Sequence, residues 1–175
     1  VADSGLITIT GAKWTTYRKM AEETVDEAIA VAHLPETPCP TADLKIHGYV
    51  ASQPENHYLN IYGSDSAFIR ELINYEPTLG QPLHPGFPQV KAEVVWAVRN
   101  EMARTVEDVL ARRLRILFLD ARAAVEMAPQ VAAIMAAELG YDTAWQEKQL
   151  QEFTLLAENY LLQPQIPIQP LSTTY

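Results

Sequence analysis

The stretch Gln89–Arg113, QVKAEVVWAVRNEMARTVEDVLARR, decides the fold because it is the longest periodic region of the chain. Its apolar side chains recur mainly every four residues, which is typical of one face of an α-helix; the positions are Val94, Val98, Met102, Val106 and Val109. Within it, Thr105 opens the tetrad TVED, which resembles a helix-capping arrangement. We therefore expect two helices at an angle, the first ending near Arg104 and the second beginning at Thr105.

Further helices are predicted downstream of this stretch. Residues 120–139 are rich in Ala and should form a helix that ends at Gly140. Pro129 lies inside it and should remove one backbone hydrogen bond, so that the helix bends or splits. A last helix is expected from Thr143 to about Tyr160.

Upstream, helical segments alternate with proline-rich connections. Residues 64–75 have a helical pattern and are followed by EPTLGQPLHPGFP, residues 76–88, which predicts a loop. Residues 35–63 read as a linker, with a short extended piece at 44–50. The sequence thus predicts an all-α protein of about five or six helices in a bundle-like array.

The first 34 residues have a different character. The β-branched run Leu6–Thr10 predicts a strand, and from Thr16 the pattern changes to that of an amphipathic helix ending at Leu34-Pro35. A glycine, Gly11, and then polar residues stand at the handover. Backbone N–H groups at a helix start suit a negatively charged partner, although an ordinary helix cap explains the same pattern and is the simpler interpretation.

Composition limits the functional classes. The 175 residues suit one domain, or one domain and a fragment of another, and the net charge of −9 argues against binding to nucleic acid. The single cysteine, Cys39, can form neither an internal disulfide nor a multi-cysteine zinc site. No run of about 18 apolar residues is present to span a bilayer, and no basic signal sequence is recognised at the start. Since the chain also begins without Met, we expect it to be cut from something longer.

The patterns of the histidines and of the arginines at 104–115 favour structural roles over functional sites. The four histidines show no spacing typical of metal ligands, so no metal site is predicted; they are His33, His47, His57 and His84. The arginines of residues 104–115 lie at helical spacing from Glu101, Glu107 and Asp108, which favours salt bridges. The alternative for these arginines is a surface that binds an anion or a partner.

Two separated segments carry a family resemblance. SGLITITGAKWTTYRKMAEETVDEAI resembles the end of the flavin domain of FAD-dependent, quinone-linked glycerol-3-phosphate dehydrogenases, and HPGFPQVKAEVVWAVRNEMARTVEDVLARRLRILFLDARAA resembles their helical C-terminal domain. The two motifs stand in the family's order, and the resemblance covers roughly residues 4–162. It implies a flavin-domain remnant of one strand and one helix at 1–34, a helical C-terminal domain at 35–163, and an extended or disordered tail at 164–175.

The resemblance also implies a function for the parent protein. Such enzymes oxidise sn-glycerol 3-phosphate to dihydroxyacetone phosphate, transfer hydride to FAD and pass electrons to a membrane quinone. It places five residues beside the flavin: Gly11, Lys13, Trp14, Thr15 and Thr16. Lys13 would add positive charge near the flavin or the substrate phosphate. Ala12 stands where the family usually has a second glycine, and its methyl group would either crowd the cofactor or only restrict φ.

The rest of a flavin site is missing from this sequence. No G-x-G-x-x-G turn is present, so the fragment is expected neither to retain FAD nor to turn over substrate. The parent is expected to be cytoplasmic and peripheral to the membrane, with the N-terminal FAD domain, substrate and quinone as partners. The alternative is a helical interaction module without a catalytic role, which docks a flavin domain, another subunit or a membrane surface. Both hypotheses are compatible with assembly of the chain into a homo-oligomer.

Overall fold

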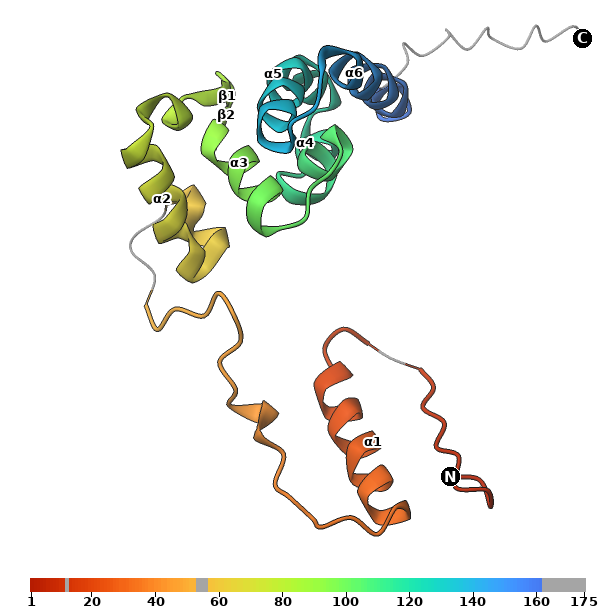
Figure 1. Ribbon diagram of the computed structural model, residues 1–175. Helices are drawn as coiled ribbons and strands as arrows, with labels where there is room; N and C mark the ends of the chain where they lie inside the picture. Colours follow the sequence, from red (N-terminus) through yellow and green to blue (C-terminus); the bar gives the residue numbers. More distant parts are fainter. Residues whose placement is uncertain (12, 53–56, 162–175) are drawn as a thin grey trace, which may run out of the picture. The chain divides into compact units, whose positions relative to one another are not determined.

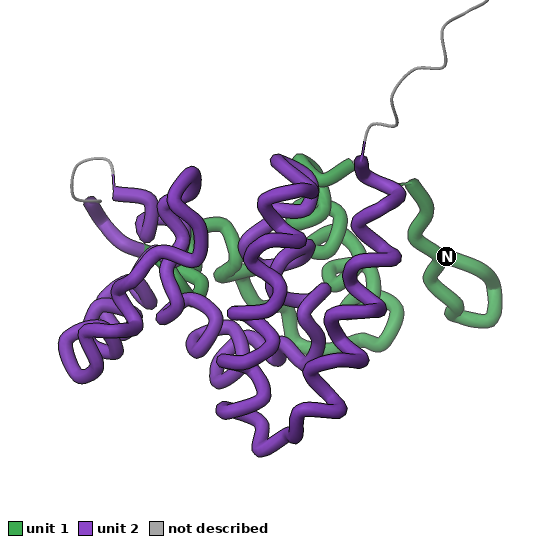
Figure 2. The backbone as a smooth tube through the Cα atoms, turned by 90° about the horizontal axis from the view of Figure 1, so that it is seen from above, with its two compact units in different colours: residues 1–49 green, residues 50–175 purple. Residues whose placement is uncertain are grey.

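The computed structural model describes residues 1–11, 13–52 and 57–161 (Figure 1). The chain forms two compact units, Val1–Tyr49 and Val50–Tyr175 (Figure 2). The described residues are largely helical with one two-stranded hairpin, which confirms the predicted helical fold class. The domain limits at 34 and 163 stay predictions. Ala12 and the predicted tail at 164–175 lie outside the described residues.

The first unit is built around α1, Tyr17–Val31, followed by the short 3-10 helix η1, Pro40–Ala42. The predicted helix is therefore confirmed. Along α1, Arg18 Nη1 lies 2.7 Å from Glu22 Oε2, one helical turn further on. Although α1 is amphipathic, none of its residues is buried.

The strand predicted at Leu6–Thr10 is wrong, because residues 1–11 contain no strand. Instead, the N–H of Ala2 donates to the carbonyl of Leu6 at 2.8 Å, and the N–H of Gly5 donates to the carbonyl of Ala2 at 2.9 Å. A lone β-branched segment has no ladder partner for its backbone groups, so high β-propensity alone does not make a strand. Residues 44–50, where a short extended piece was expected within the linker, contain a turn at 47–48 and no helix or strand.

The second unit begins with helices and a hairpin. The elements are η2 at Tyr58–Asp65, α2 at Ser66–Tyr75, η3 at Pro77–Gly80, and the antiparallel strands β1 at Pro82–His84 and β2 at Phe87–Val90. The predicted helix at 64–75 is confirmed, but the loop expected at 76–88 contains η3 and most of the hairpin. Strands this short show no period-two pattern, and the prolines within them, Pro82 and Pro88, argue against a strand in the sequence.

A helix break in the deciding stretch is confirmed, although it comes earlier than expected. Helix α3, Lys91–Asn100, is followed by the π-helix η4, Asp108–Arg113, and by α4, Ile116–Leu119. Met102 has a φ of 59° and is 79% exposed, so it leaves the apolar stripe. The break is capped as TVED predicted: Asp108 Oδ2 accepts the N–H of Thr105 at 3.0 Å, and Thr105 Oγ1 accepts that of Asp108 at 3.1 Å.

Pro129 was expected to bend or split the helix; α5 runs from Ala121 to Leu139 without a break, so the helix is not split there. Pro129 is exposed, while Met127 and Val131 on either side of it are fully buried, and this packing holds the helix through the missing hydrogen bond.

The ends of the last two helices agree closely with the sequence. Gly140, with a φ of 72°, ends α5 as predicted. The last helix, α6, is Thr143–Glu158, and its cap is Asp142 rather than Thr143: Asp142 Oδ1 accepts the N–H of Trp145 at 2.9 Å. The helix itself is confirmed.

Two separate apolar clusters hold the second unit together. The main core surrounds α5, which contacts α3, α4 and α6 (Figure 1). A smaller cluster joins η2 and α2 to the end of β2 and to α3; its buried members are Leu59, Ile69, Val90, Ala92 and Trp96. In the described residues, the main core contains no side chain from η2 or α2.

Candidate functional site

The segment predicted to contact flavin forms a tight turn at the start of α1. Thr16 is the N-cap, but its side chain makes no capping bond to the helix. Instead, Thr16 Oγ1 donates to the Lys13 carbonyl at 3.2 Å, and the Thr16 N–H donates to the same carbonyl at 2.9 Å. The first N–H groups of α1 are therefore left without a side-chain cap, at the positive end of the helix.

The side chains of this turn are exposed. Lys13, Thr15 and Thr16 are all exposed, and Trp14 is 87% exposed, with its ring centroid 5.3 Å from that of Tyr17. Gly11 has a φ of 73°, a left-handed conformation that favours glycine. The structure thus brings the predicted residues together around one turn, open to whatever lies beside it.

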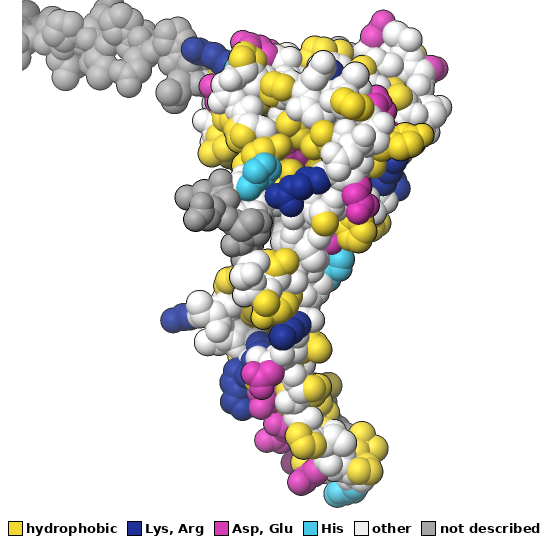
Figure 3. Space-filling view, turned by 90° about the vertical axis from the view of Figure 1, so that its left-hand side faces the viewer, with side chains coloured by type: hydrophobic (Ala, Val, Ile, Leu, Met, Phe, Trp, Pro, Cys, Tyr) yellow, Lys and Arg dark blue, Asp and Glu magenta, His cyan; other side chains and the backbone are white. Residues whose placement is uncertain are grey.

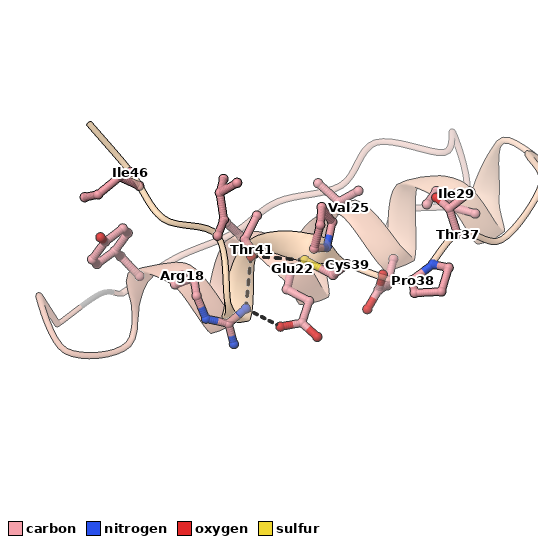
Figure 4. Close-up of a pocket in the computed structure, with 14 residues that line it drawn as sticks. Arg18, Glu22, Val25, Ile29, Thr37, Pro38, Cys39, Thr41 and Ile46 are labelled. Atoms are coloured by element: carbon pink, nitrogen blue, oxygen red, sulfur yellow. Dashed lines mark hydrogen bonds and ion pairs between the residues drawn. The ribbon is translucent and has the colours of Figure 1, made fainter. Parts of the chain in front are cut away.

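A groove runs beside α1 within the first unit, between the helix and residues 37–46 (Figure 4). Its volume is about 590 Å³, and Val25, Ile29 and Ile46 contribute to an apolar lining. Arg18 Nη1 bonds both Glu22 and, at 3.1 Å, Thr41 Oγ1, and so ties the helix to the segment that follows it. The bond from Arg18 lowers the pKa of the Glu22 carboxyl. In the sequence, the stripe Tyr17, Ala21, Val25 was the signal for this groove.

Apolar side chains are also widespread on the surface. Within the first unit, the large exposed ones include Leu6, Ile9, Tyr17, Val25, Leu44 and Ile46. Figure 3 shows yellow hydrophobic side chains beside charged ones on the visible surface. A surface of this kind is typical of a segment that packs against another part of a protein.

The arginine-rich segment forms ion pairs, as the sequence favoured. Arg112 bonds Glu107 Oε1 at 2.6 Å and Asp108 Oδ1 at 3.0 Å. Arg113 Nε lies 3.4 Å from Glu101 Oε2. With these partners inside the unit, the structure supports salt bridging and gives no support to the alternative of an anion-binding surface.

Two histidines have structural partners. His84 Nδ1 accepts the N–H of Gly86 at 3.0 Å, which leaves its Nε2–H to donate to Glu126 Oε2, also at 3.0 Å. His57 Nδ1 accepts the N–H of Leu59 at 3.2 Å. Across the described ranges, no three potential His, Cys, Asp or Glu ligands gather as a metal site would require.

Sequence reasoning missed the most unusual ionisable group, Glu93. It is fully buried near the start of α3, where Oε2 accepts the N–H of Val90 at 2.7 Å and Oε1 accepts the hydroxyl of Tyr62 at 3.0 Å. Burial raises the pKa of Glu93 to about 7, although both hydrogen bonds oppose this shift. Its signal in the sequence was an acidic residue inside the apolar run KAEVVWAV.

Comparison with known proteins places the chain. The family described as the C-terminal domain of alpha-glycerophosphate oxidase matches residues 5–146. A probable mitochondrial glycerol-3-phosphate dehydrogenase of Caenorhabditis elegans is 41% identical over 173 residues, covering 87% of this chain and 24% of that protein. The mitochondrial glycerol-3-phosphate dehydrogenase of Mesocricetus auratus is 34% identical, over 88% of this chain and 24% of its own length. That of Arabidopsis thaliana is 33% identical, over 89% of this chain and 30% of its own length.

Two limits accompany these matches. The chain spans about a quarter of the length of the first two relatives, and no solved structure matches it significantly. Since the family match covers well over half of the chain and the identities are substantial, the resemblance seen in the sequence is confirmed. The chain belongs to the family of the C-terminal domain of alpha-glycerophosphate oxidase, and it is homologous to the C-terminal region of glycerol-3-phosphate dehydrogenases.

Proposed function

We propose that this chain is the C-terminal part of an FAD-dependent glycerol-3-phosphate dehydrogenase. The parent would oxidise sn-glycerol 3-phosphate to dihydroxyacetone phosphate, transfer hydride to FAD and pass electrons to quinone. The observation that carries the proposal is the Lys13–Thr16 turn, which stands exposed at an uncapped helix start in a chain with such relatives.

The residues of the turn fit one edge of a flavin site. When bound, FAD supplies the hydride acceptor, and its reduction leaves negative charge on the ring. Backbone donors and the positive end of α1 would stabilise that negative charge. Lys13 would strengthen this stabilisation with its own positive charge, or it would bind the substrate phosphate. Gly11 allows a close approach, since no heavy atom lies within 4 Å of where its Cβ would be. Trp14, Thr15 and Thr16 would complete this edge, while the remaining walls must come from the rest of the parent.

Recovery of activity tests the proposal. This chain would be mixed with the separately produced N-terminal flavin domain, and glycerol-3-phosphate oxidation would be followed with an artificial electron acceptor. We expect activity in the mixture and none in this chain alone, because the chain carries only one edge of the site. An FAD-bound, active preparation of this chain alone would contradict the predicted inactivity.

A matched pair of lysine variants in the full-length parent tests the role of the turn. Lys13→Ala should lower activity by about tenfold or more, since it removes positive charge from the reacting groups. Lys19→Ala, on the helix α1 that follows the turn, is the control and should change activity by less than about twofold, because Lys19 pairs with Glu22 and Glu23 on the surface. Equal effects of the two variants would argue against a site at Lys13.

The second candidate is an interaction module without a catalytic role. It is favoured by one observation: α1 is amphipathic yet buries none of its residues. An apolar helix face of this kind normally packs against another surface. The partner would be a flavin domain, another subunit or a membrane surface. In the mixing experiment, a stable complex that shows no dehydrogenase activity would select this candidate, and a chain that stays monomeric beside the flavin domain would exclude docking.

Cellular location follows from the relatives only as a proposal. The relatives named above are called mitochondrial, whereas the sequence led us to expect a cytoplasmic parent peripheral to a membrane. No helix in the described part of the chain is long and apolar enough to cross a bilayer. We propose a peripheral association for the parent, which fractionation of membranes with a high-salt wash would test.

A further inference from the structure

The segment formed by η2 and α2, residues 58–75, is attached to the rest of the second unit by its own small core. We call this segment the arm; it lies beside α3 in Figure 1. Leu59 and Ile69 are the buried side chains that it contributes, and they pack against Val90, Ala92 and Trp96. Because this cluster is much smaller than the main core, we expect the arm to open at a lower free energy than α5 and its neighbours need to unfold.

Glu93 lies where the arm meets α3. Its carboxylate accepts the Tyr62 hydroxyl from the arm at 3.0 Å and the Val90 N–H from the end of β2 at 2.7 Å. The side chain has no exposed surface. One buried carboxyl group therefore joins three elements through two hydrogen bonds.

The charges around Glu93 do not neutralise it. The titratable groups that interact with Glu93 are Tyr58 and Tyr62 from η2 and Glu101 at the end of its own helix. Charged groups one step further out are Arg70 from α2, which acts on Tyr58, and Asp65 and Arg113, which act on Glu101. Arg113 pairs with Glu101 instead, and Arg70 Nη1 bonds Ser66 at 3.1 Å. Within the described ranges, no Lys or Arg forms an ion pair with Glu93. An ionised Glu93 is thus a buried negative charge without a cation, which is costly.

We propose that Glu93 is a proton-controlled latch, which holds the arm on α3 while it is protonated and loosens the arm when it ionises. The latch lies wholly in the second unit and does not depend on any flavin chemistry. The latch proposal can fail while the proposed dehydrogenase function holds. The dehydrogenase proposal can likewise fail while the latch holds.

The direction of the effect follows from proton linkage. In the closed arm, burial raises the pKa of Glu93 to about 7, whereas an open arm returns it toward the ordinary 4.5. The closed state therefore binds the proton more tightly, so its advantage is complete below the ordinary value and is lost as the pH rises through the raised one. Nearby Glu101, whose pKa is also raised by burial, acts in the same direction.

Hydrogen exchange on the full chain tests the latch. Amide exchange would be measured by mass spectrometry from pH 5 to pH 8 and corrected for the intrinsic pH dependence of exchange. The opening constant of α2 should rise by about 70-fold between pH 5 and pH 8 and level off near the top of this range, while amides of α5 report no such change. A flat profile for α2 would overturn the proposal.

Variants separate Glu93 from other carboxyl groups. Glu93→Gln should remove most of the pH dependence of α2 opening and leave only the part due to Glu101. Glu126→Gln, which changes an exposed carboxyl paired with His84, should leave the pH dependence intact. Tyr62→Phe keeps the ring but removes a hydrogen bond that favours the charged form, so it should enlarge the rise. An unchanged rise in Glu93→Gln would overturn the proposal; if that variant does not fold, an unchanged profile in Tyr62→Phe would do so.

Discussion

Arg99 and Glu138 join α3 to α5 through two parallel hydrogen bonds, from Nε to Oε2 at 2.6 Å and from Nη2 to Oε1 at 2.8 Å. The planar guanidinium of arginine matches both oxygens of a carboxylate, which an ammonium group cannot do. The pair spans 39 residues of sequence and fixes how the first helix of the main core lies on the longest one.

Replacing this arginine should have a modest cost. Arg99→Lys should lower the free energy of unfolding by about 0.5–1 kcal/mol, because the fork is lost but water already screens a side chain that is 53% exposed. Urea denaturation followed by circular dichroism measures the change. Arg122→Lys, an exposed arginine on α5, is the control and should have almost no effect. Equal losses in the two variants would show that the two-pronged bond contributes nothing.

Removing the aromatic ring that holds α6 on α5 should have a large cost. Phe153 is 2% exposed in the main core, so Phe153→Ala should lower the free energy of unfolding by about 3–5 kcal/mol through lost burial and a cavity. Phe118→Ala is the matched control on an exposed ring and should cost less than about 1 kcal/mol. The same urea titration compares them, and similar losses would mean that α6 is not held by this side chain.

The end of α5 depends on backbone conformation rather than on space. Gly140 has a φ of 72°, and a Cβ built there meets no heavy atom within 4 Å. Gly140→Ala should therefore cost about 1 kcal/mol, purely from the left-handed conformation. Gly140→Asn should cost less, since asparagine tolerates this region better. Thermal unfolding of the two variants measures the difference, and a larger loss for Asn would indicate a steric cause instead.

Asp108 predicts a pH dependence opposite in sign to that of Glu93. Burial alone would raise the pKa of Asp108, but hydrogen bonds from Arg104 and Thr105 and the charge of Arg112 outweigh it and lower the pKa below the ordinary 3.8. A lowered folded-state pKa gives stability that is complete above the ordinary value and is lost as the pH falls through the lowered one. Asp108→Asn should reduce the loss of stability measured between pH 5 and pH 2. An unchanged acid limb would assign that loss to other carboxyl groups.

Local sequence signals located the helices well. The amphipathic stripe after Thr16, the TVED cap and Gly140 each depend on residues within one or two helical turns, so periodicity and capping chemistry were enough to place α1, the break after α3 and the end of α5. The GAKWTT segment was singled out by motif as a flavin contact, and that role stays a prediction; the structure places its described residues around one turn at the start of α1.

The wrong secondary-structure predictions fall where contacts with residues distant in sequence decide the structure. The run Leu6–Thr10 has strand-forming residues but no neighbour to bond, and the hairpin at Pro82–Val90 forms despite its prolines because β1 and β2 pair with each other and pack on α3 and α5. Pro129 was expected to bend or split a helix, yet α5 is not split, because buried neighbours on both sides hold it together. In each case, a contact outside the local window outweighs an intrinsic preference.

The sequence by itself determined the helical class, most helix limits and the family, because periodicity, caps and motifs depend only on residues close together in sequence. Only the tertiary structure showed that Glu93 is buried beside Tyr62, 31 residues away, and that no Lys or Arg in the described part of the chain forms an ion pair with it. It also showed that α1 buries nothing within its own unit. Burial and ionisation depend on what surrounds a side chain in space, and that environment is assembled from segments whose separation along the chain carries no local signal.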